Sequence, residues 1–142
     1  MTERSASVVW NGDLIDGRGT IAAAPSGAFG PLEVTWASRA EDPDGRTSPE
    51  ELIASAWAAC FAMALSNGLA KGGTTAEKLE TSATVAFQPG EGIVRAKLTV
   101  RGTVPGLDAD GFSAAAEDAK QNCPVSKALT GIPDVSLEAT LA

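Results

Sequence analysis

Residues 48–71 read SPEELIASAWAACFAMALSNGLAK and predict one long helix. Ser48 fits the N-cap, Pro49 fits the first helical position, and Glu51 completes a capping box. The pair Gly72-Gly73 follows Lys71 and marks the end of the helix. A helix of about two dozen residues is well above the mean length in globular proteins. We therefore expect it to be the central element of the fold.

The same helix is a candidate membrane span, because Leu52 to Ala70 carries no charged residue and is about long enough to cross a bilayer. Much of this segment is alanine, which contributes little transfer energy, and Ser55, Ser66 and Asn67 weaken it further. A helix that is apolar on all sides can also be buried against a sheet or a partner. We expect the buried helix and no membrane association.

The remaining patterns predict strands and two shorter helices. Residues 39–47 are polar, contain Pro43 and Gly45, and predict a loop. The order β-β-β-α-β-β-α-α-β indicates an α+β fold with antiparallel hairpins, and no linker or repeat divides residues 1–142, so we expect a single domain. The predicted strands are 5–10, 14–23, 32–36, 79–87, 93–104 and 135–141, and the further helices are 109–120 and 124–129.

Composition makes the cysteine thiols the leading candidates for any chemistry that this protein carries out. The formal net charge is −7 with no basic cluster, which argues against nucleic acid and anionic lipid as partners. The chain has no histidine and two cysteines, too few ligands to favour a transition-metal site, and no cofactor is indicated. No apolar stretch follows the first residues, so we expect no export signal and a reducing, cytoplasmic location, where a catalytic disulfide can still form.

Local sequence favours Cys123 as the more acidic thiol. A cysteine before proline at a helix start faces free backbone N–H groups and the positive end of the helix dipole. Cys60 lies in the middle of the long helix, where burial raises a thiol pKa. By itself this setting is typical of a small core residue. Cys60 therefore needs an activating group from outside its own helix.

An arginine can supply that activation, because a nearby guanidinium lowers the pKa of an acid by roughly one to three units. Arg18, Arg39 and Arg46 precede the helix, and Glu50 can orient such an arginine. Glu50 and Cys60 are separated by about 15 Å along a straight helix, so they cannot share a site within it. We therefore predict a site assembled across the interface of a homodimer.

Two blocks of sequence carry a family resemblance. Residues 47–53 and 58–65, followed by residues 104–108 and 119–129, closely resemble the OsmC branch of the OsmC/Ohr peroxidases. The resemblance covers nearly the whole chain and implies an OsmC-like α+β fold. That fold has antiparallel sheets, a long central helix and an intertwined homodimer with two sites at the interface.

The resemblance also implies a mechanism and residue roles. The implied activity is a thiol-dependent peroxidase that prefers organic hydroperoxides to hydrogen peroxide, with a dihydrolipoyl dithiol as reductant. Cys60 is then the peroxidatic cysteine and Cys123 the resolving one, which reverses the order from local helix physics. Glu50 maps onto the family glutamate. The family arginine maps best onto Arg39, with Arg18 as second choice, while Arg46 is a loop charge.

Other interpretations stay open at this point. The protein can be a thiol redox sensor or thiol–disulfide oxidoreductase, although it has no Cys-x-x-Cys pair. It can also be a non-enzymatic dimer that binds apolar molecules with inert cysteines. Trp57, Phe61 and Met63 are expected either to line an apolar substrate pocket or to pack in the core.

Overall fold

The computed structural model describes residues 1–142, which divide into two compact units, Met1–Leu52 and Ile53–Ala142. The long predicted helix is present as α2 (Pro49–Lys71), with the expected bounds, and it begins in the first unit and continues through the second. Ser48 is its N-cap as predicted, because the N–H of Glu51 donates to Ser48 Oγ at 3.2 Å. The α+β fold class is confirmed, and the single domain remains a prediction.

The first unit holds a small antiparallel sheet in the order β1-β2-β3. Its strands, β1 (Val8–Asn11), β2 (Arg18–Ile21) and β3 (Leu32–Val34), are shorter than the sequence predicted. The turn between β1 and β2 is longer than a tight hairpin, and the N–H of Gly17 closes it by donating to the carbonyl of Asp13 at 3.0 Å. This turn takes up residues that were expected in the second strand.

A short helix was missed by the sequence analysis. Residues 35–36 were expected to end a strand and residues 39–40 to begin a loop, but the structure forms α1 (Trp36–Ala40) there. Thr35 is its N-cap and accepts from the N–H of Ser38, while Ser38 Oγ accepts from the N–H of Thr35 at 2.9 Å. This reciprocal capping explains the turn into a helix, because it satisfies two backbone donors at once.

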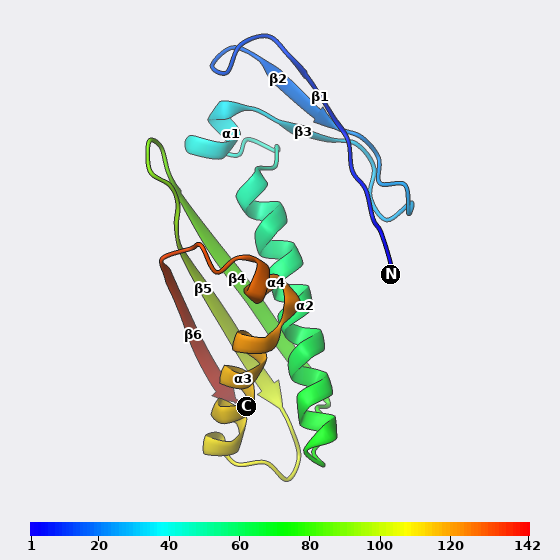
Figure 1. Cartoon of the computed structure of the whole chain (residues 1–142), viewed down its shortest axis with the longest axis vertical. Helices are drawn as coiled ribbons and strands as arrows, with labels where there is room; N and C mark the ends of the chain where they lie inside the picture. Colours follow the sequence, from blue (N-terminus) through cyan, green and yellow to red (C-terminus); the bar gives the residue numbers. More distant parts are fainter. The chain divides into compact units, whose positions relative to one another are not determined.

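The second unit contains the larger sheet, in the order β4-β5-β6, with two further helices (Figure 1). Strands β4 and β5 form the predicted antiparallel hairpin. Strand β6 departs from the expected antiparallel arrangement and runs parallel to β5. The connection through α3 and α4 explains this direction, because it carries the chain back before β6 begins. The bounds are β4 (Lys78–Gln88), β5 (Gly92–Thr103), α3 (Ala109–Asn122), α4 (Pro124–Ala128) and β6 (Asp134–Leu141).

The core of this unit lies between the sheet and the helices α2 and α3. Residues of α2 at a spacing of four form one buried stripe, Trp57, Phe61, Leu65 and Leu69. This stripe belongs to the same cluster as alternate residues of β5 and the inner face of α3, and Cys123 is also a member. The β5 and α3 members are Ala96, Leu98, Val100, Phe112, Ala116 and Ala119.

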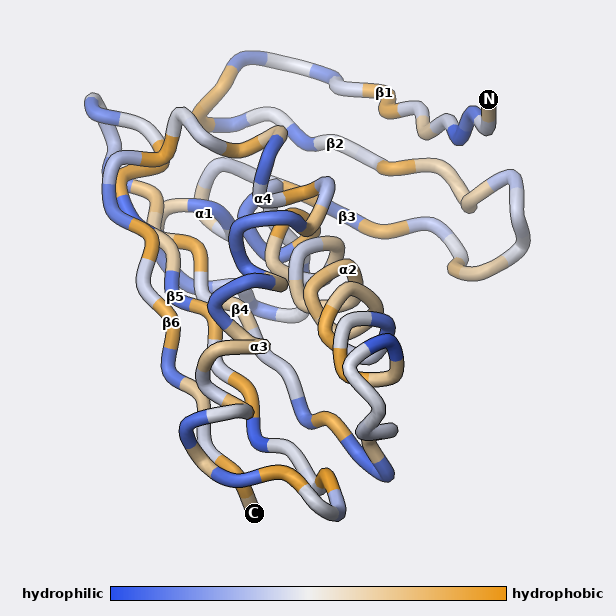
Figure 2. The backbone as a smooth tube through the Cα atoms, turned by 60° about the horizontal axis from the view of Figure 1, so that its bottom comes forward, coloured by the Kyte–Doolittle hydropathy of each residue, from blue (hydrophilic) through white to orange (hydrophobic).

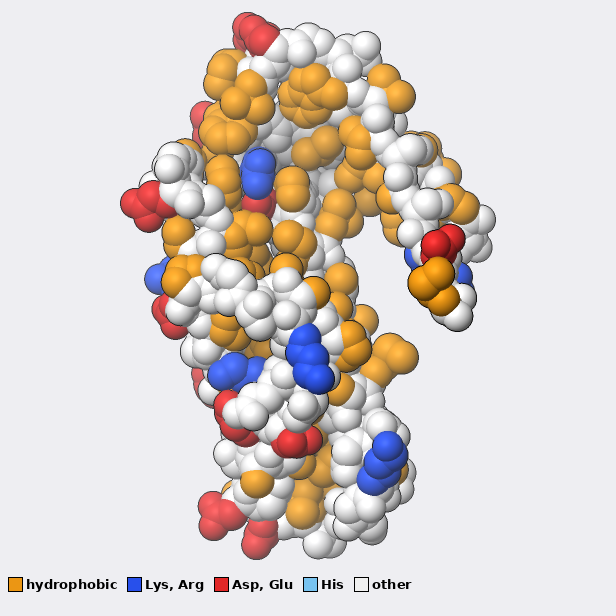
Figure 3. Space-filling view, viewed as in Figure 1, with side chains coloured by type: hydrophobic (Ala, Val, Ile, Leu, Met, Phe, Trp, Pro, Cys, Tyr) orange, Lys and Arg blue, Asp and Glu red, His pale blue; other side chains and the backbone are white.

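The other side of α2 is exposed within one chain. By its length and its mean hydropathy of 1.5, α2 could cross a membrane. Only 22% of this apolar segment is buried within the chain. Figure 2 shows apolar colouring along most of α2, and Figure 3 shows apolar side chains on the molecular surface. Met63 is 74% exposed, whereas Trp57 and Phe61 are core residues. Within one chain, the expected burial of α2 is therefore met only along the stripe that faces the core.

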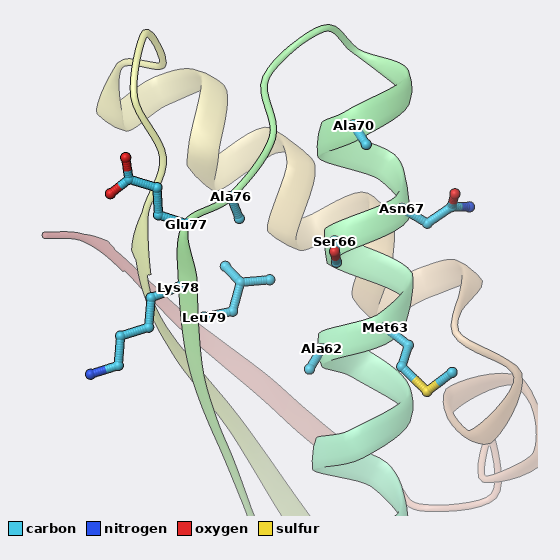
Figure 4. A pocket seen from close by; sticks show the side chains of 9 residues that line it. All are labelled: Ala62, Met63, Ser66, Asn67, Ala70, Ala76, Glu77, Lys78 and Leu79. Carbon is cyan, nitrogen blue, oxygen red and sulfur yellow. The ribbon is translucent and has the colours of Figure 1, made fainter.

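This exposed side of α2 borders an open groove with a volume of about 670 Å³. Figure 4 shows its lining, which comes from α2 on one side and from the start of β4 on the other. Small side chains and one methionine occupy the helical side, and the charged Glu77 and Lys78 lie at the strand side. The lining residues from α2 are Ala62, Met63, Ser66, Asn67 and Ala70.

Candidate active site

Cys123 lies at the break between α3 and α4. The residue before a proline avoids the helical region, and Cys123 takes φ −57° and ψ 129°, which ends α3 before Pro124 starts α4. Its N–H still donates to the carbonyl of Ala119 at 2.9 Å, and its own carbonyl accepts from the N–H of Lys127 at 3.0 Å. This rigid corner holds the Cys123 side chain in the core, where it is 0% exposed.

Cys60 lies on α2 next to the buried stripe and is half-buried. Its Sγ atom is 2.9 Å from the Sγ atom of Cys123, although the two residues are 63 positions apart in sequence. Both cysteines are free thiols. The sulfur–sulfur bond of a disulfide is about 2.0 Å long, so a small movement of the side chains can join them. The structure therefore brings the two predicted redox cysteines together.

The two thiols differ in acidity. Burial raises the pKa of Cys60, and the hydrogen bond with Cys123 raises it further. Burial also acts to raise the pKa of Cys123, but hydrogen bonds from the Cys60 thiol, from Ser126 and from the N–H of Val125 outweigh it and lower that pKa. Either thiol can donate to the other at this distance. Within one chain, Cys60 is thus the less acidic thiol, as local sequence predicted.

Arg39 and Glu50 form a two-pronged ion pair in the first unit. Arg39 Nη2 donates to Glu50 Oε1 at 2.7 Å, and Arg39 Nε donates to Oε1 at 3.0 Å and to Oε2 at 3.2 Å. The Glu50 side chain is only 7% exposed, compared with 31% for Arg39. The structure therefore brings together the predicted arginine and the predicted glutamate in the geometry that suits guanidinium and carboxylate groups.

Local contacts set the position of this pair. Arg39 lies on α1, and Ser38 next to it donates its hydroxyl proton to the carbonyl of Thr47 at 2.8 Å. Thr47 in turn donates through Oγ1 to Glu51 Oε1 at 2.7 Å. These bonds attach α1 to the start of α2, one residue away from Glu50. The loop between α1 and α2 is thereby fixed at both of its ends, which places the Arg39 guanidinium next to Glu50.

The two other candidate arginines occupy different settings. Arg18 is exposed on β2. Arg46 lies in the loop, where it forms long ion pairs of 3.4 Å with the exposed carboxylates of Glu33 and Asp44. Neither has a partner comparable to Glu50, which favours Arg39 as the arginine of the site.

An apolar cavity of about 330 Å³ opens beside Arg39 within the first unit. Its walls come from the sheet, from α1 and from the first turn of α2, and Arg39 is the only charged residue among them. The lining residues are Val8, Trp10, Leu14, Ile21, Val34, Thr35, Trp36, Arg39, Pro49 and Leu52. The cavity thus has mostly apolar walls and one positively charged hydrogen-bond donor, the Arg39 guanidinium.

Two residues near Cys123 were not singled out as redox partners by the sequence analysis. Ser126 follows Cys123 by three positions, and it is among the groups that lower the pKa of Cys123. Trp57, considered only as a pocket or core residue, donates from Nε1 to Ser126 Oγ at 2.7 Å. The spacing Cys-Pro-x-Ser is a local signal for Ser126, because it places the hydroxyl in the first turn of a helix that starts at the proline. No local signal indicates the Trp57 contact.

The fold and the site define an α+β protein in which two free thiols lie 2.9 Å apart. The chain belongs to the OsmC-like protein family, whose pattern matches residues 42–138, so the expected resemblance is confirmed. It is 39% identical over 123 residues to the peroxiredoxin OsmC of Escherichia coli (strain K12), which covers 84% of this chain and 85% of that protein. The peroxiredoxin OsmC of Shigella flexneri matches to the same extent.

Solved structures show the same fold. An OsmC-like protein from Mycoplasma pneumoniae superposes with a TM-score of 0.75 at 16% identity, covering 99% of this chain and 98% of that one. An organic hydroperoxide resistance protein OsmC from Legionella pneumophila gives 0.70 at 21% identity, with 99% of both chains covered. OhrB of Bacillus subtilis gives 0.66 at 24% identity, with 97% and 98% covered. The expected OsmC-like fold is confirmed.

Proposed function

We propose that this protein is a thiol-dependent peroxidase that reduces organic hydroperoxides, and hydrogen peroxide less well, through a sulfenic acid on Cys60. Membership of the OsmC-like family and the peroxiredoxin relatives make it a cysteine-based, peroxide-reducing enzyme. The observation that carries the detailed proposal is the distance of 2.9 Å between two free thiols. A sulfenic acid formed on one of them has its resolving partner already in place.

Accessibility decides which thiol attacks the peroxide. Cys60 is half-buried, whereas Cys123 is 0% exposed. A hydroperoxide must reach the attacking sulfur in line with its O–O bond, so Cys60 is the sulfur that can meet it. We assign the peroxidatic role to Cys60 and the resolving role to Cys123, against the order of their pKa values within one chain.

The chemistry then runs in three steps. The Cys60 thiolate attacks the distal peroxide oxygen, the O–O bond breaks, and an alcohol leaves after taking up a proton, so Cys60 becomes a sulfenic acid. The Cys123 thiolate attacks the Cys60 sulfur, hydroxide leaves as water after protonation, and a disulfide forms. A dithiol reductant restores both thiols by exchange and becomes a disulfide itself. We propose a dihydrolipoyl group for this reductant.

Activation of Cys60 requires a cation, because its surroundings within one chain raise its pKa. We propose that the Arg39–Glu50 pair provides it. A guanidinium lowers a neighbouring pKa by roughly one to three units, and the same N–H groups polarise the peroxide O–O bond. Glu50 holds the guanidinium in one orientation through hydrogen bonds of 2.7, 3.0 and 3.2 Å.

The cavity beside Arg39 supports an organic substrate. Its surround is apolar and its volume of about 330 Å³ can hold an alkyl or aryl group. Hydrogen peroxide has no apolar portion to place there and gains no binding free energy from burial. We therefore propose that the hydrocarbon part of the substrate occupies this cavity while its peroxide oxygens meet Arg39.

We propose that the active form is a homodimer. Glu50 and Cys60 are about 15 Å apart along α2, so a second copy is the simplest source of the arginine pair for each Cys60. The exposed side of α2, with Met63 74% exposed above a groove of about 670 Å³, offers an apolar surface for that copy. Burial of α2 in the dimer also favours a cytoplasmic protein over a membrane one.

The test is to treat the reduced protein with cumene hydroperoxide and with hydrogen peroxide, then to map the oxidised sulfurs by mass spectrometry. We expect a Cys60–Cys123 disulfide and faster loss of cumene hydroperoxide. Cys60→Ser should abolish turnover, whereas Ser113→Ala on the exposed side of α3 should not affect it. Full activity of Cys60→Ser refutes the proposal. Oxidation without catalytic peroxide loss indicates a redox sensor, and no oxidation indicates a binding protein.

A further inference from the structure

Trp10 is a partly exposed aromatic residue whose side chain is held by the turn that follows it. It lies on β1 and borders the cavity beside Arg39. Its indole Nε1–H donates to the carbonyl of Gly12 at 3.1 Å and to the carbonyl of Asp13 at 3.2 Å. The same turn is closed by the N–H of Gly17, which also donates to the carbonyl of Asp13. One edge of the ring is therefore tied to the backbone, although the residue is 39% exposed.

The other part of the ring lies over a glycine. Trp10 is opposite Gly19 in the sheet, and Gly19 is opposite Val34 on the next strand. A Cβ atom at Gly19 would lie 2.7 Å from Trp10 Cε3 and 2.8 Å from Val34 Cγ1. Carbon atoms in contact are about 3.5–4.0 Å apart, so only glycine leaves room for both side chains. The six-membered part of the indole therefore packs directly on the backbone of β2.

This ring is the aromatic part of the wall that the sheet gives to the cavity. The other sheet residues in that wall are aliphatic, namely Val8, Ile21 and Val34, and Arg39 is the only charged residue around the cavity. A hydrocarbon group that enters beside Arg39 therefore meets an indole whose position is already fixed. A contact with a fixed side chain costs less conformational entropy than a contact with a mobile one, so this ring is well suited to bind a ligand.

We propose that Trp10 makes the cavity selective for hydroperoxides that carry an aryl group on the carbon next to the peroxide, because the aryl ring packs against the indole. This inference rests on the proposed function, since it names the substrate class of the same site. Contact between two aromatic rings adds roughly two- to tenfold to affinity beyond the burial of apolar area. A compact alkyl peroxide, such as tert-butyl hydroperoxide, gains the burial but not the ring contact.

The first experiment measures selectivity as the ratio of kcat/KM for cumene hydroperoxide to kcat/KM for tert-butyl hydroperoxide. Trp10→Leu removes the ring, Trp10→Phe keeps an aromatic ring, and Gly19→Ala keeps the indole but adds a carbon that must displace it. Trp36→Leu removes the aromatic ring that α1 gives to the cavity. Val9→Ala is the matched control, because Val9 is 64% exposed and, by strand alternation, lies on the opposite face of the sheet. Hydrogen peroxide, which has no hydrocarbon part, reports general damage to the site.

The second experiment measures binding without turnover. The reduced protein is titrated with 2-phenyl-2-propanol, the alcohol that cumene hydroperoxide yields, and separately with tert-butanol. Binding is followed by nuclear magnetic resonance of the Trp10 indole N–H, whose signal is identified by its absence from the spectrum of Trp10→Phe. We expect the phenyl alcohol to shift this signal at a lower concentration than tert-butanol does, because only the phenyl alcohol brings a ring to the indole.

We expect Trp10→Leu and Gly19→Ala to lower the selectivity ratio roughly two- to tenfold, Trp10→Phe to keep most of it, and Val9→Ala to match wild type. An equal loss of rate with all three peroxides in Trp10→Leu overturns the inference. A ratio that falls only in Trp36→Leu also overturns it. If no peroxide is turned over but the phenyl alcohol still binds at Trp10 in preference to tert-butanol, the proposed function fails while the aryl preference of the cavity stands.

Discussion

Substitution of Arg39 and substitution of Glu50 should lower the stability of the protein by different amounts. Arg39→Met removes the guanidinium but keeps an aliphatic stem, and it leaves the Glu50 carboxylate, 7% exposed, without the three hydrogen bonds that it accepts. Glu50→Gln leaves a cation that is 31% exposed and can turn toward water, while the amide oxygen still accepts a bond. Loss of the arginine should therefore cost more than neutralisation of the glutamate.

The magnitudes follow from this difference in burial. Breaking a buried pair by removal of one partner costs roughly 3–5 kcal/mol, and water access on the Arg39 side lowers our expectation to about 2 kcal/mol for Arg39→Met. Glu50→Gln should cost about 1 kcal/mol, the free energy of one ordinary hydrogen bond. The double variant should lose about 2 kcal/mol of stability, which is less than the sum of the two single losses. Once one partner is gone, the second substitution has no ion pair left to break.

Equilibrium urea unfolding, followed by both tryptophan fluorescence and circular dichroism, measures these free energies. Coincidence of the two probes tests two-state behaviour, and a fixed protein concentration is needed if the protein is a dimer. Arg46→Met is the matched control, because its ion pairs are 3.4 Å long and its carboxylate partners are exposed. It should cost less than about 0.5 kcal/mol. Additive single variants, or an Arg39→Met protein as stable as the control, would contradict the reasoning.

Three further predictions concern the reaction and the assembly. Arg39→Met should move the pH dependence of the peroxide reaction to higher pH, since the reactive form is the thiolate and burial raises the pKa of Cys60 when no cation opposes it; a profile like that of wild type in stopped-flow kinetics would exclude Arg39 as the activator. Cys123→Ser should complete one turnover and stop at a Cys60 sulfenic acid, which dimedone traps for mass spectrometry; continued turnover with dithiol alone would show that Cys123 is dispensable. Met63→Glu should weaken the homodimer about a hundredfold or more, because it places a charge in an apolar interface. The same change should hardly affect the folding free energy of the single chain, where the Met63 side chain is 74% exposed. Light scattering that shows wild-type mass at every concentration would remove α2 from the interface.

Local sequence determined the parts of this protein that depend on neighbouring residues. Ser48, Pro49 and the glycines after Lys71 set the bounds of α2, because caps and breakers act within one turn of the backbone. The corner at Cys123 follows from Pro124 in the same way. The family resemblance in the two cysteine blocks added the residue roles that propensity alone could not indicate.

Tertiary structure decided what depends on distant residues. The distance of 2.9 Å between Cys60 and Cys123, the pairing of Arg39 with Glu50, and the bond from Trp57 to Ser126 all join segments that are remote in sequence or lie on different elements. The helix α1 and the parallel direction of β6 were likewise missed or misjudged. Local sequence predicted which thiol is the more acidic, but the burial and hydrogen bonds that shift the two pKa values are properties of the packed chain. Substrate access belongs to this second group for the same reason.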